Sequence, residues 1–281
     1  MARGIQKWTP EVIARLKLDG RGIGEGSNYK PWIDVVNVSS LGRSRRVFSP
    51  ITGRQHELLS DVEWNLFLML EWAEDVIDIR EQFPLDCDLT QEIASALQIH
   101  HPFYPRTKVP TVMTADFLVT RRKNGKSFLE AFNAKCTEEA EDVRSLEKLE
   151  IQRAYFDGMG VRHHVVYSSE IPMEKVRTIE WIRSGYLKEG ETEPYLGFFK
   201  EHVDRIATEL GRVRSNQTLN EYCEEYTHRF AIPTGTALRC SKMLMHSRTL
   251  IADLQNVDLA SAPLSSFHIN QPRKQMSLTK E

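Results

Sequence analysis

The stretch from Thr111 to Cys136 constrains the fold more than any other part of the chain. It consists of two runs rich in β-branched and aromatic residues, separated by the dipeptide Asn124-Gly125. Asn-Gly readily supplies the two residues of positive φ that a tight hairpin turn requires. The sequence therefore predicts two antiparallel strands joined at this turn.

Polar side chains interrupt this predicted hairpin at positions where an apolar strand is expected. Asp116 lies in an otherwise apolar run, where an unpaired carboxylate is costly to bury. Asn133 and Lys135 share one face of the second strand, because successive side chains alternate between faces. A carboxylate on one strand beside an amide and a lysine on its neighbour resembles the metal site of the PD-(D/E)xK nucleases.

These residue types suit phosphodiester hydrolysis, in which a metal binds the scissile oxygen and acidifies a water. Mg²⁺ can be held by one or two carboxylates together with waters and substrate phosphates. Asp116 fits the first ligand, while the side chain of Asn133 and the backbone carbonyl of Ala134 offer further oxygens. Lys135 can orient or deprotonate the attacking water, or stabilise the negative transition state. The alternative is that Asp116 and Lys135 form a structural ion pair only.

Glu63 is the candidate for a further acid. It stands three residues after Ser60 at the start of a predicted helix, which is the spacing of a capping box. That spacing favours a structural role, whereas a carboxylate from a helix would also complete the charge balance of a metal site. Both roles stay open at this point.

The segment before this helix carries a dense group of basic residues, Arg43, Arg45, Arg46 and Arg54. The net charge is −2 and the isoelectric point is near 6.5, so any surface that binds nucleic acid must be local. The four arginines are the best candidates for phosphate contacts. A solvated edge hairpin, protected from aggregation by its charges, explains them equally well.

Composition is that of an ordinary globular protein, with 281 residues of which 27% are charged. The four cysteines have no CxxC spacing, so we expect free thiols in a reducing bacterial cytoplasm rather than zinc or disulfides. No run approaches the roughly 20 apolar residues of a membrane span, and we expect no association with membranes.

The order of elements predicts an α/β fold. A helix around residues 141–160 and a strand at 161–168 follow the hairpin, so a mixed sheet receives helices on its faces. Past Pro172 the sequence becomes helical, and a helix pair that includes Arg239 and Lys242 is compatible with a winged helix-turn-helix. We therefore expect a catalytic domain at 1–171, a winged-helix-like domain at 172–269 and a flexible tail at 270–281.

The sequence also resembles the TnsA endonuclease subunits of heteromeric, Tn7-like transposases. The resemblance covers most of the first 170 residues and is weaker beyond them. It is carried by these segments: GRGIGEG…YKPW, GRSRRVFSPITGRQHELLSDVEW, LEWAEDVIDIREQFPL, MTADFLV, FNAKC and RSLEKLEIQRAYF.

The resemblance implies a restriction-endonuclease-like fold with Glu63, Asp116 and Lys135 as the catalytic acids and lysine. Asn133 departs from the Asp or Glu that the wider nuclease group prefers, which leaves the number of bound metal ions open. The implied cofactor is Mg²⁺, with Mn²⁺ as a substitute. The implied activity is cleavage of the 5′ ends of a transposon in double-stranded DNA.

The resemblance further implies two protein partners. A DDE-type transposase would cut and join the 3′ ends, and an AAA+ regulator would contact the C-terminal domain. Two other functions remain: a non-cleaving DNA-binding adaptor within a transposase complex, and a stand-alone restriction-type nuclease. Intact Asp116 and Lys135 argue against the first, and the absence of an evident basic recognition domain argues against the second.

Overall fold

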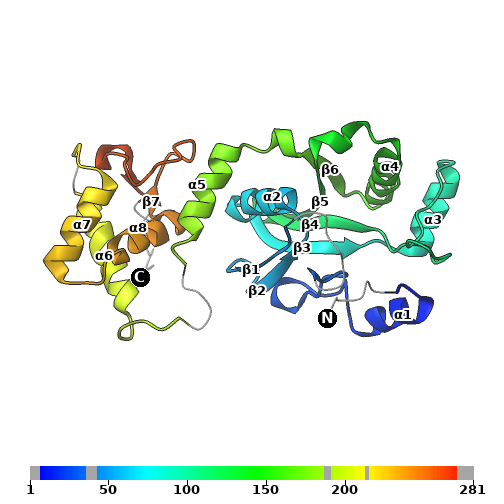
Figure 1. Cartoon of the computed structure of the whole chain (residues 1–281), viewed down its shortest axis with the longest axis horizontal. Helices are drawn as coiled ribbons and strands as arrows, with labels where there is room; N and C mark the ends of the chain where they lie inside the picture. The colour runs from blue at the N-terminus through cyan, green and yellow to red at the C-terminus, as the bar shows by residue number, and fades with distance from the viewer. Residues whose placement is uncertain (1–6, 36–42, 187–190, 213–214, 271–281) are drawn as a thin grey trace, which may run out of the picture. The chain divides into compact units, whose positions relative to one another are not determined.

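The computed structural model describes residues 7–35, 43–186, 191–212 and 215–270. The chain forms two compact units, Met1–Ile171 and Pro172–Glu281 (Figure 1). The structure does not assign a function to either unit, so the domain roles expected from the sequence stay predictions. No helix in the described ranges is long and apolar enough to span a bilayer.

The first unit is built on a four-stranded mixed sheet in the order β3-β4-β5-β6. Its strands are β3 (Val76–Pro84), β4 (Thr114–Lys123), β5 (Lys126–Lys135) and β6 (Arg162–Tyr167). The first three strands are antiparallel, and β6 runs parallel to β5. Asn124 and Gly125 have φ of 52° and 76°, so the predicted hairpin and its turn are confirmed.

Two helices cover opposite faces of this sheet. Helix α2 (Asp61–Trp72) packs Phe67 against Phe117 of β4, with 6.3 Å between ring centroids. On the other face, Tyr155 and Phe156 of helix α4 (Val143–Gly158) join a core that includes Leu118. Because neighbouring residues of a strand face opposite ways, both faces of β4 are buried. The mixed α/β sheet with helices on its faces is confirmed.

Smaller elements surround this core. They are α1 (Pro10–Leu18), η1 (Gly26–Asn28), β1 (Arg45–Ser49), β2 (Arg54–Leu58), α3 (Cys87–Ala96), η3 (Thr137–Glu141) and η4 (Ser168–Glu170). β1 and β2 form a separate antiparallel hairpin. The arginines of the basic group therefore lie on or just before this hairpin.

The second unit is mainly helical. It contains α5 (Met173–Arg183), α6 (Phe198–Leu210), α7 (Leu219–Phe230), α8 (Thr236–His246), η5 (Leu264–Ser266) and the paired strands β7 (Leu250–Ile251) and β8 (His268–Ile269). Helix α8 contacts α5, α6 and α7 and is the central helix of this unit. All but one residue of the predicted tail, 270–281, lie outside the described residues.

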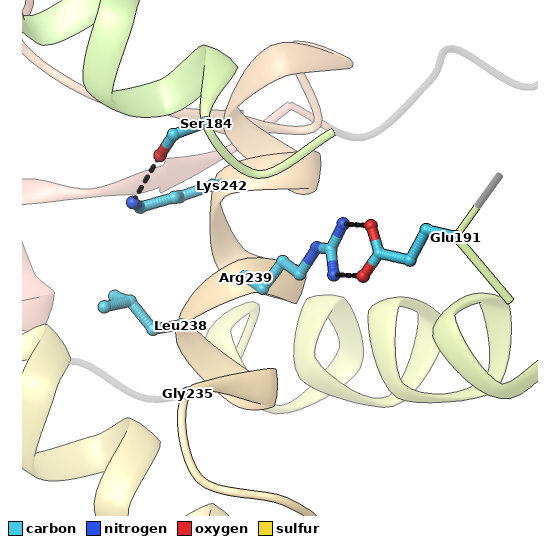
Figure 2. A pocket seen from close by; sticks show the side chains of 6 residues that line it. All are labelled: Ser184, Glu191, Gly235, Leu238, Arg239 and Lys242. Atoms are coloured by element: carbon cyan, nitrogen blue, oxygen red, sulfur yellow. Dashed lines mark hydrogen bonds and ion pairs between the residues drawn. The ribbon is translucent and has the colours of Figure 1, made fainter. Parts of the chain in front are cut away.

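The order of α7, α8 and a strand pair agrees with the helix pair of a winged helix, but the environment of α8 does not. Each residue of α8 is buried or half-buried, whereas a recognition helix presents exposed side chains to a groove. Arg239 and Lys242 line a pocket of about 250 Å³, where Arg239 pairs with Glu191 and Lys242 donates to Ser184 over 2.8 Å (Figure 2). The winged-helix assignment therefore stays a prediction, and these two cations lie in the pocket.

Candidate active site

Asp116 lies where the pairing of β4 with β5 ends. The last paired position joins Phe117 to Phe132. One residue further along, Oδ2 of Asp116 accepts a hydrogen bond of 2.8 Å from the backbone N–H of Ala134. The carboxylate thus takes the partner position that a strand carbonyl would occupy, and its side chain is fixed at the end of the ladder.

Glu63 enters the site from the first turn of α2. Its backbone N–H donates to Oγ of Ser60 over 3.1 Å, and its Oε2 accepts from the backbone N–H of Leu59 over 2.9 Å. The capping role predicted from the spacing is therefore present, except that the N–H that donates back to the Glu63 side chain belongs to Leu59 instead of Ser60. Glu63 is also only 6% exposed, which a cap alone does not require. Glu63 therefore caps helix α2 and is also buried.

Both acids of the site are harder to ionise than a free carboxyl group. Burial raises the pKa of Glu63 to about 8, and the charge of Asp116 acts in the same direction. Burial also raises the pKa of Asp116, while the charge of Lys135 and the N–H of Ala134 act against that rise. A positive charge near two such carboxylates would favour their ionised forms.

Lys135 supplies part of that positive charge from β5. Its charge lowers the pKa of both Glu63 and Asp116. Its ion pair, however, is with Glu139, at 3.8 Å, and the lysine side chain is 28% exposed. The partly exposed ammonium group therefore lowers the pKa of both acids, while its ion pair is with Glu139 and not with Asp116.

Asn133 is buried on the same strand and is 2% exposed. Its Oδ1 lies 2.7 Å from Nε2 of His163 on β6. Asn133 and Asp116 each lie one residue beyond the last paired position, Phe132–Phe117, so their side chains are neighbours, and the Asn133 amide lowers the pKa of the Asp116 carboxyl. The side-chain oxygen of Asn133, which the sequence predicted as a metal ligand, therefore contacts His163. The sequence analysis did not identify His163, although two adjacent histidines, His163 and His164, lie in a predicted strand.

A magnesium ion fits this donor set in charge and chemistry. Within the described ranges, no group of three or more His, Cys, Asp and Glu side chains is arranged to hold a metal. Mg²⁺ needs fewer protein ligands than that, because it keeps several waters and binds substrate phosphates. Glu63, Asp116 and the carbonyl of Ala134 are hard oxygen donors, and the raised pKa values of the acids are the observation that favours a cation here.

Gln82 is a second site residue that the sequence analysis did not identify. It lies on β3 between positions paired with Phe117 and Ala115, level with Asp116. Its Nε2 donates toward Oε2 of Glu63 over 3.4 Å, and its Oε1 accepts from Oγ1 of Thr114 over 3.1 Å. The signal in the sequence was the run Arg80-Glu81-Gln82, three consecutive polar residues in a predicted strand.

The predicted DNA-contacting arginines separate into two groups. Arg43 and Arg46 are exposed, and Nε of Arg46 pairs with Glu57 over 2.8 Å. Arg45 is half-buried, pairs with Asp61 over 2.8 Å and lies over the ring of Trp64. These three side chains remain on the surface of the β1–β2 hairpin, so a role in phosphate contact stays a prediction for them.

Arg54 does not belong to such a surface, and its prediction as a DNA contact is wrong. The side chain is 8% exposed and pairs with Glu81, which is fully buried. Its guanidinium also donates to the carbonyls of Gly26, Gln55 and Ile79. With its donors engaged inside the protein, Arg54 has none to offer a phosphate.

The pair Arg54–Glu81 is part of a buried polar cluster. Nδ1 of His56 lies 2.8 Å from Glu81, and its Nε2 lies 2.8 Å from Oγ1 of Thr52. Burial acts to raise the pKa of Glu81, but His56 and Arg54 hold it at about 2. The cluster fastens the β1–β2 hairpin to β3 at the residue next to Gln82.

A mixed sheet that carries an acid and a lysine at the end of a central hairpin, with a second acid on a helix against it, is the arrangement of a nuclease-like α/β protein. Residues 73–168 match the family model described as "TnsA-like endonuclease N terminal". This span contains Asp116, Asn133 and Lys135, while Glu63 precedes it. The transposon Tn7 transposition protein TnsA of Escherichia coli is 40% identical over 193 residues, which cover 69% of this chain and 70% of that protein. The chain belongs to the TnsA-like endonuclease family.

Proposed function

We propose that this protein is a Mg²⁺-dependent endonuclease that cleaves DNA at the 5′ ends of a transposon during cut-and-paste transposition. The observation that carries the proposal is the meeting of Glu63, Asp116 and Lys135, from three separate elements, with the pKa values of both acids raised. If Glu63 were only a helix cap, and Asp116 and Lys135 only an ion pair, their proximity would not be expected.

Each residue has a distinct part in the proposed chemistry. Glu63, Asp116 and the carbonyl of Ala134 would hold the metal, which when bound activates a water and neutralises charge on the phosphate. Asp116 is kept in place by the N–H of Ala134, so this ligand is oriented before substrate arrives. Lys135 lies close enough to influence both acids. Its ammonium group would stabilise negative charge, or its neutral amine would accept a proton of the attacking water.

The partners follow from the family. The Escherichia coli relative is a transposition protein of transposon Tn7. We propose that this chain acts on double-stranded DNA at transposon ends, together with a DDE-type transposase that processes the 3′ ends. Contact of the second unit with an AAA+ regulator is part of the same proposal. The surface arginines Arg43, Arg45 and Arg46 would position the DNA backbone.

The test is strand-specific cleavage of a duplex that carries a transposon end, with Mg²⁺ or Mn²⁺ and with or without the cognate transposase. We expect cuts at the 5′ ends that require the metal and disappear in Asp116→Ala. The Asp116→Ala protein should keep its fold, because the change removes a carboxylate that is costly to bury. Cleavage by Asp116→Ala at the wild-type rate would contradict the proposal, and metal-independent DNA binding without cleavage would indicate an adaptor.

A further inference from the structure

The contact between His163 and Asn133 links β6 to the site. In the parallel pairing of β5 with β6, Ala131 lies opposite His163 and Asn133 lies opposite Val165. The side chains of these four residues point to one face of the sheet, so the imidazole reaches the amide two residues further along. The resulting separation of Nε2 and Oδ1 is 2.7 Å, a short hydrogen bond.

The chemistry of the amide fixes which way Asn133 points. Its Oδ1 accepts, and its nitrogen carries two donors. A carboxylate only accepts, so the arrangement that satisfies both neighbours turns the nitrogen toward Asp116 and the oxygen toward an N–H of His163. The opposite orientation would place two acceptors against each other at Asp116.

The imidazole of His163 is itself held in position. Its ring stacks on Phe156 of α4, with 5.5 Å between centroids and an interplanar angle of 23°. Phe156 is fully buried in the core on this face of the sheet. The donor N–H of His163 is therefore directed at Asn133 by the core of the domain rather than by solvent.

We propose that His163 is a positioning residue that directs the amide nitrogen of Asn133 to Asp116, so that Asn133 supports a metal ligand instead of being one. This inference rests on the proposed function, because it concerns how Asp116 is prepared for the metal. It assigns Asn133 a donor role at a position from which the sequence predicted an oxygen ligand. Outer hydrogen bonds of this kind commonly change metal affinity or activity about 10–100-fold when removed.

The first experiment is a double-mutant cycle of His163→Phe and Asn133→Ala, read by calorimetric titration with Mg²⁺ in the absence of DNA. Phe keeps a ring against Phe156 and removes the N–H. We expect each single change to weaken Mg²⁺ binding about 10-fold or more, and the double variant to be no weaker than the worse single variant. His164→Phe is the matched control, since His164 stacks on Phe132 and contacts Glu130 instead.

The second experiment follows the ring nitrogens of His163 by NMR of ¹⁵N-labelled protein during Mg²⁺ addition. We expect Nε2 to carry the proton before and after the metal binds. If Asn133 turned its oxygen to the metal, its NH₂ would face His163, and Nε2 would have to become an acceptor. A change of tautomer on Mg²⁺ addition would therefore overturn the inference.

Failure of the inference and failure of the proposed function give different results. Wild-type Mg²⁺ affinity in His163→Phe, or multiplicative effects in the double variant, would overturn the positioning role while leaving the nuclease in place. A wild-type protein that neither binds Mg²⁺ nor cleaves DNA would overturn the proposed function itself.

Discussion

Gln82 donates from Nε2 to Oε2 of Glu63 over 3.4 Å while its own backbone has a φ of 47°. A positive φ is uncommon for a non-glycine residue and costs about 1–3 kcal/mol unless the surroundings impose it. Here the backbone carbonyl of Gln82 accepts from the N–H of Trp32, and the side chain is 3% exposed. The strained conformation is what brings the amide of a strand residue to the acid of a helix.

Gln82→Gly and Gln82→Ala separate the backbone role of this residue from its amide. Glycine adopts positive φ without steric cost, so Gln82→Gly should be more stable than Gln82→Ala. Both variants lack the amide, and we expect both to lose cleavage to a similar extent, about 10-fold or more, as for a lost outer hydrogen bond. Thermal unfolding and single-turnover cleavage measure the two effects. Equal stability of the two variants would contradict the claim of strain, and unchanged cleavage would contradict the role of the amide.

Glu63 predicts a dependence of stability on pH that is unusual for a carboxylate. Because its folded pKa is raised, the folded state binds more protons than the unfolded state between the ordinary value and about 8. Without metal, stability should therefore fall as pH rises through this window. Glu63→Gln keeps an oxygen for the helix cap but cannot ionise, so its stability should not fall in this way. Thermal unfolding from pH 5 to 9 in a chelator measures the difference.

The same residue predicts how metal binding depends on pH. Mg²⁺ requires the ionised acid, so binding should release protons and strengthen as pH rises toward 8. Adding Mg²⁺ should restore stability at high pH in the wild type and much less in Glu63→Gln. If Glu63→Gln cleaved normally and melted like the wild type at every pH, the residue would be a helix cap and nothing more.

Lys135→Ala is expected to fold, bind Mg²⁺ and bind DNA, but to cleave about 10²–10⁴-fold more slowly. Its ion pair with Glu139 is partly exposed, and such pairs contribute about 0–1 kcal/mol. Lys135→Arg should not restore full activity, because a guanidinium does not release its proton near neutral pH. Glu139→Gln is the control, since it breaks the same ion pair and keeps the lysine. Strong destabilisation of Lys135→Ala without a separable loss of cleavage would support a structural ion pair.

The arginines of the β1–β2 hairpin should respond in two different ways. Replacing Arg43, Arg45 and Arg46 with alanine should weaken DNA binding about equally across sequences and reduce its salt dependence, by roughly one unit of log–log slope per lost contact. DNA binding measured over a range of salt concentrations tests this. An unchanged slope would mean that these arginines only solvate the edge of the hairpin and do not contact phosphates.

Arg54→Met should instead destabilise the protein by about 3–5 kcal/mol, because it removes the guanidinium that pairs with the buried Glu81. Denaturant unfolding measures the loss. If the variant lost DNA affinity but kept its stability, Arg54 would be a DNA contact like the surface arginines.

The sequence predicted the hairpin and the acid on its first strand, Asp116, because both depend on local or adjacent residues. Asn124-Gly125 determines its own turn, and alternation along a strand determines which of Asn133 and Ala134 faces the site. It did not predict that Arg54 is buried, because four nearby arginines are indistinguishable until the partner Glu81, 27 residues away, is located.

The residues that were missed are those whose role depends on contacts between distant strands. Gln82 reaches Glu63 only because its backbone departs from strand geometry, and no residue type reveals that in advance. His163 reaches Asn133 across a parallel pairing of 30 residues' separation. The contact with His163, and not the position two residues before Lys135, determines which way the amide of Asn133 points and whether its oxygen can bind a metal.

The parallel pairing of β5 with β6 also has a consequence for the order in which the protein is synthesised. The acids and the lysine are complete when the ribosome has added Lys135, yet β6 ends at Tyr167, beyond the crossover helix α4. Until that strand has left the ribosome, Asn133 has no His163 and β5 is an open edge. A nascent chain that ends before this point would carry Glu63, Asp116 and Lys135 without the strand that pairs with β5 and contacts Asn133.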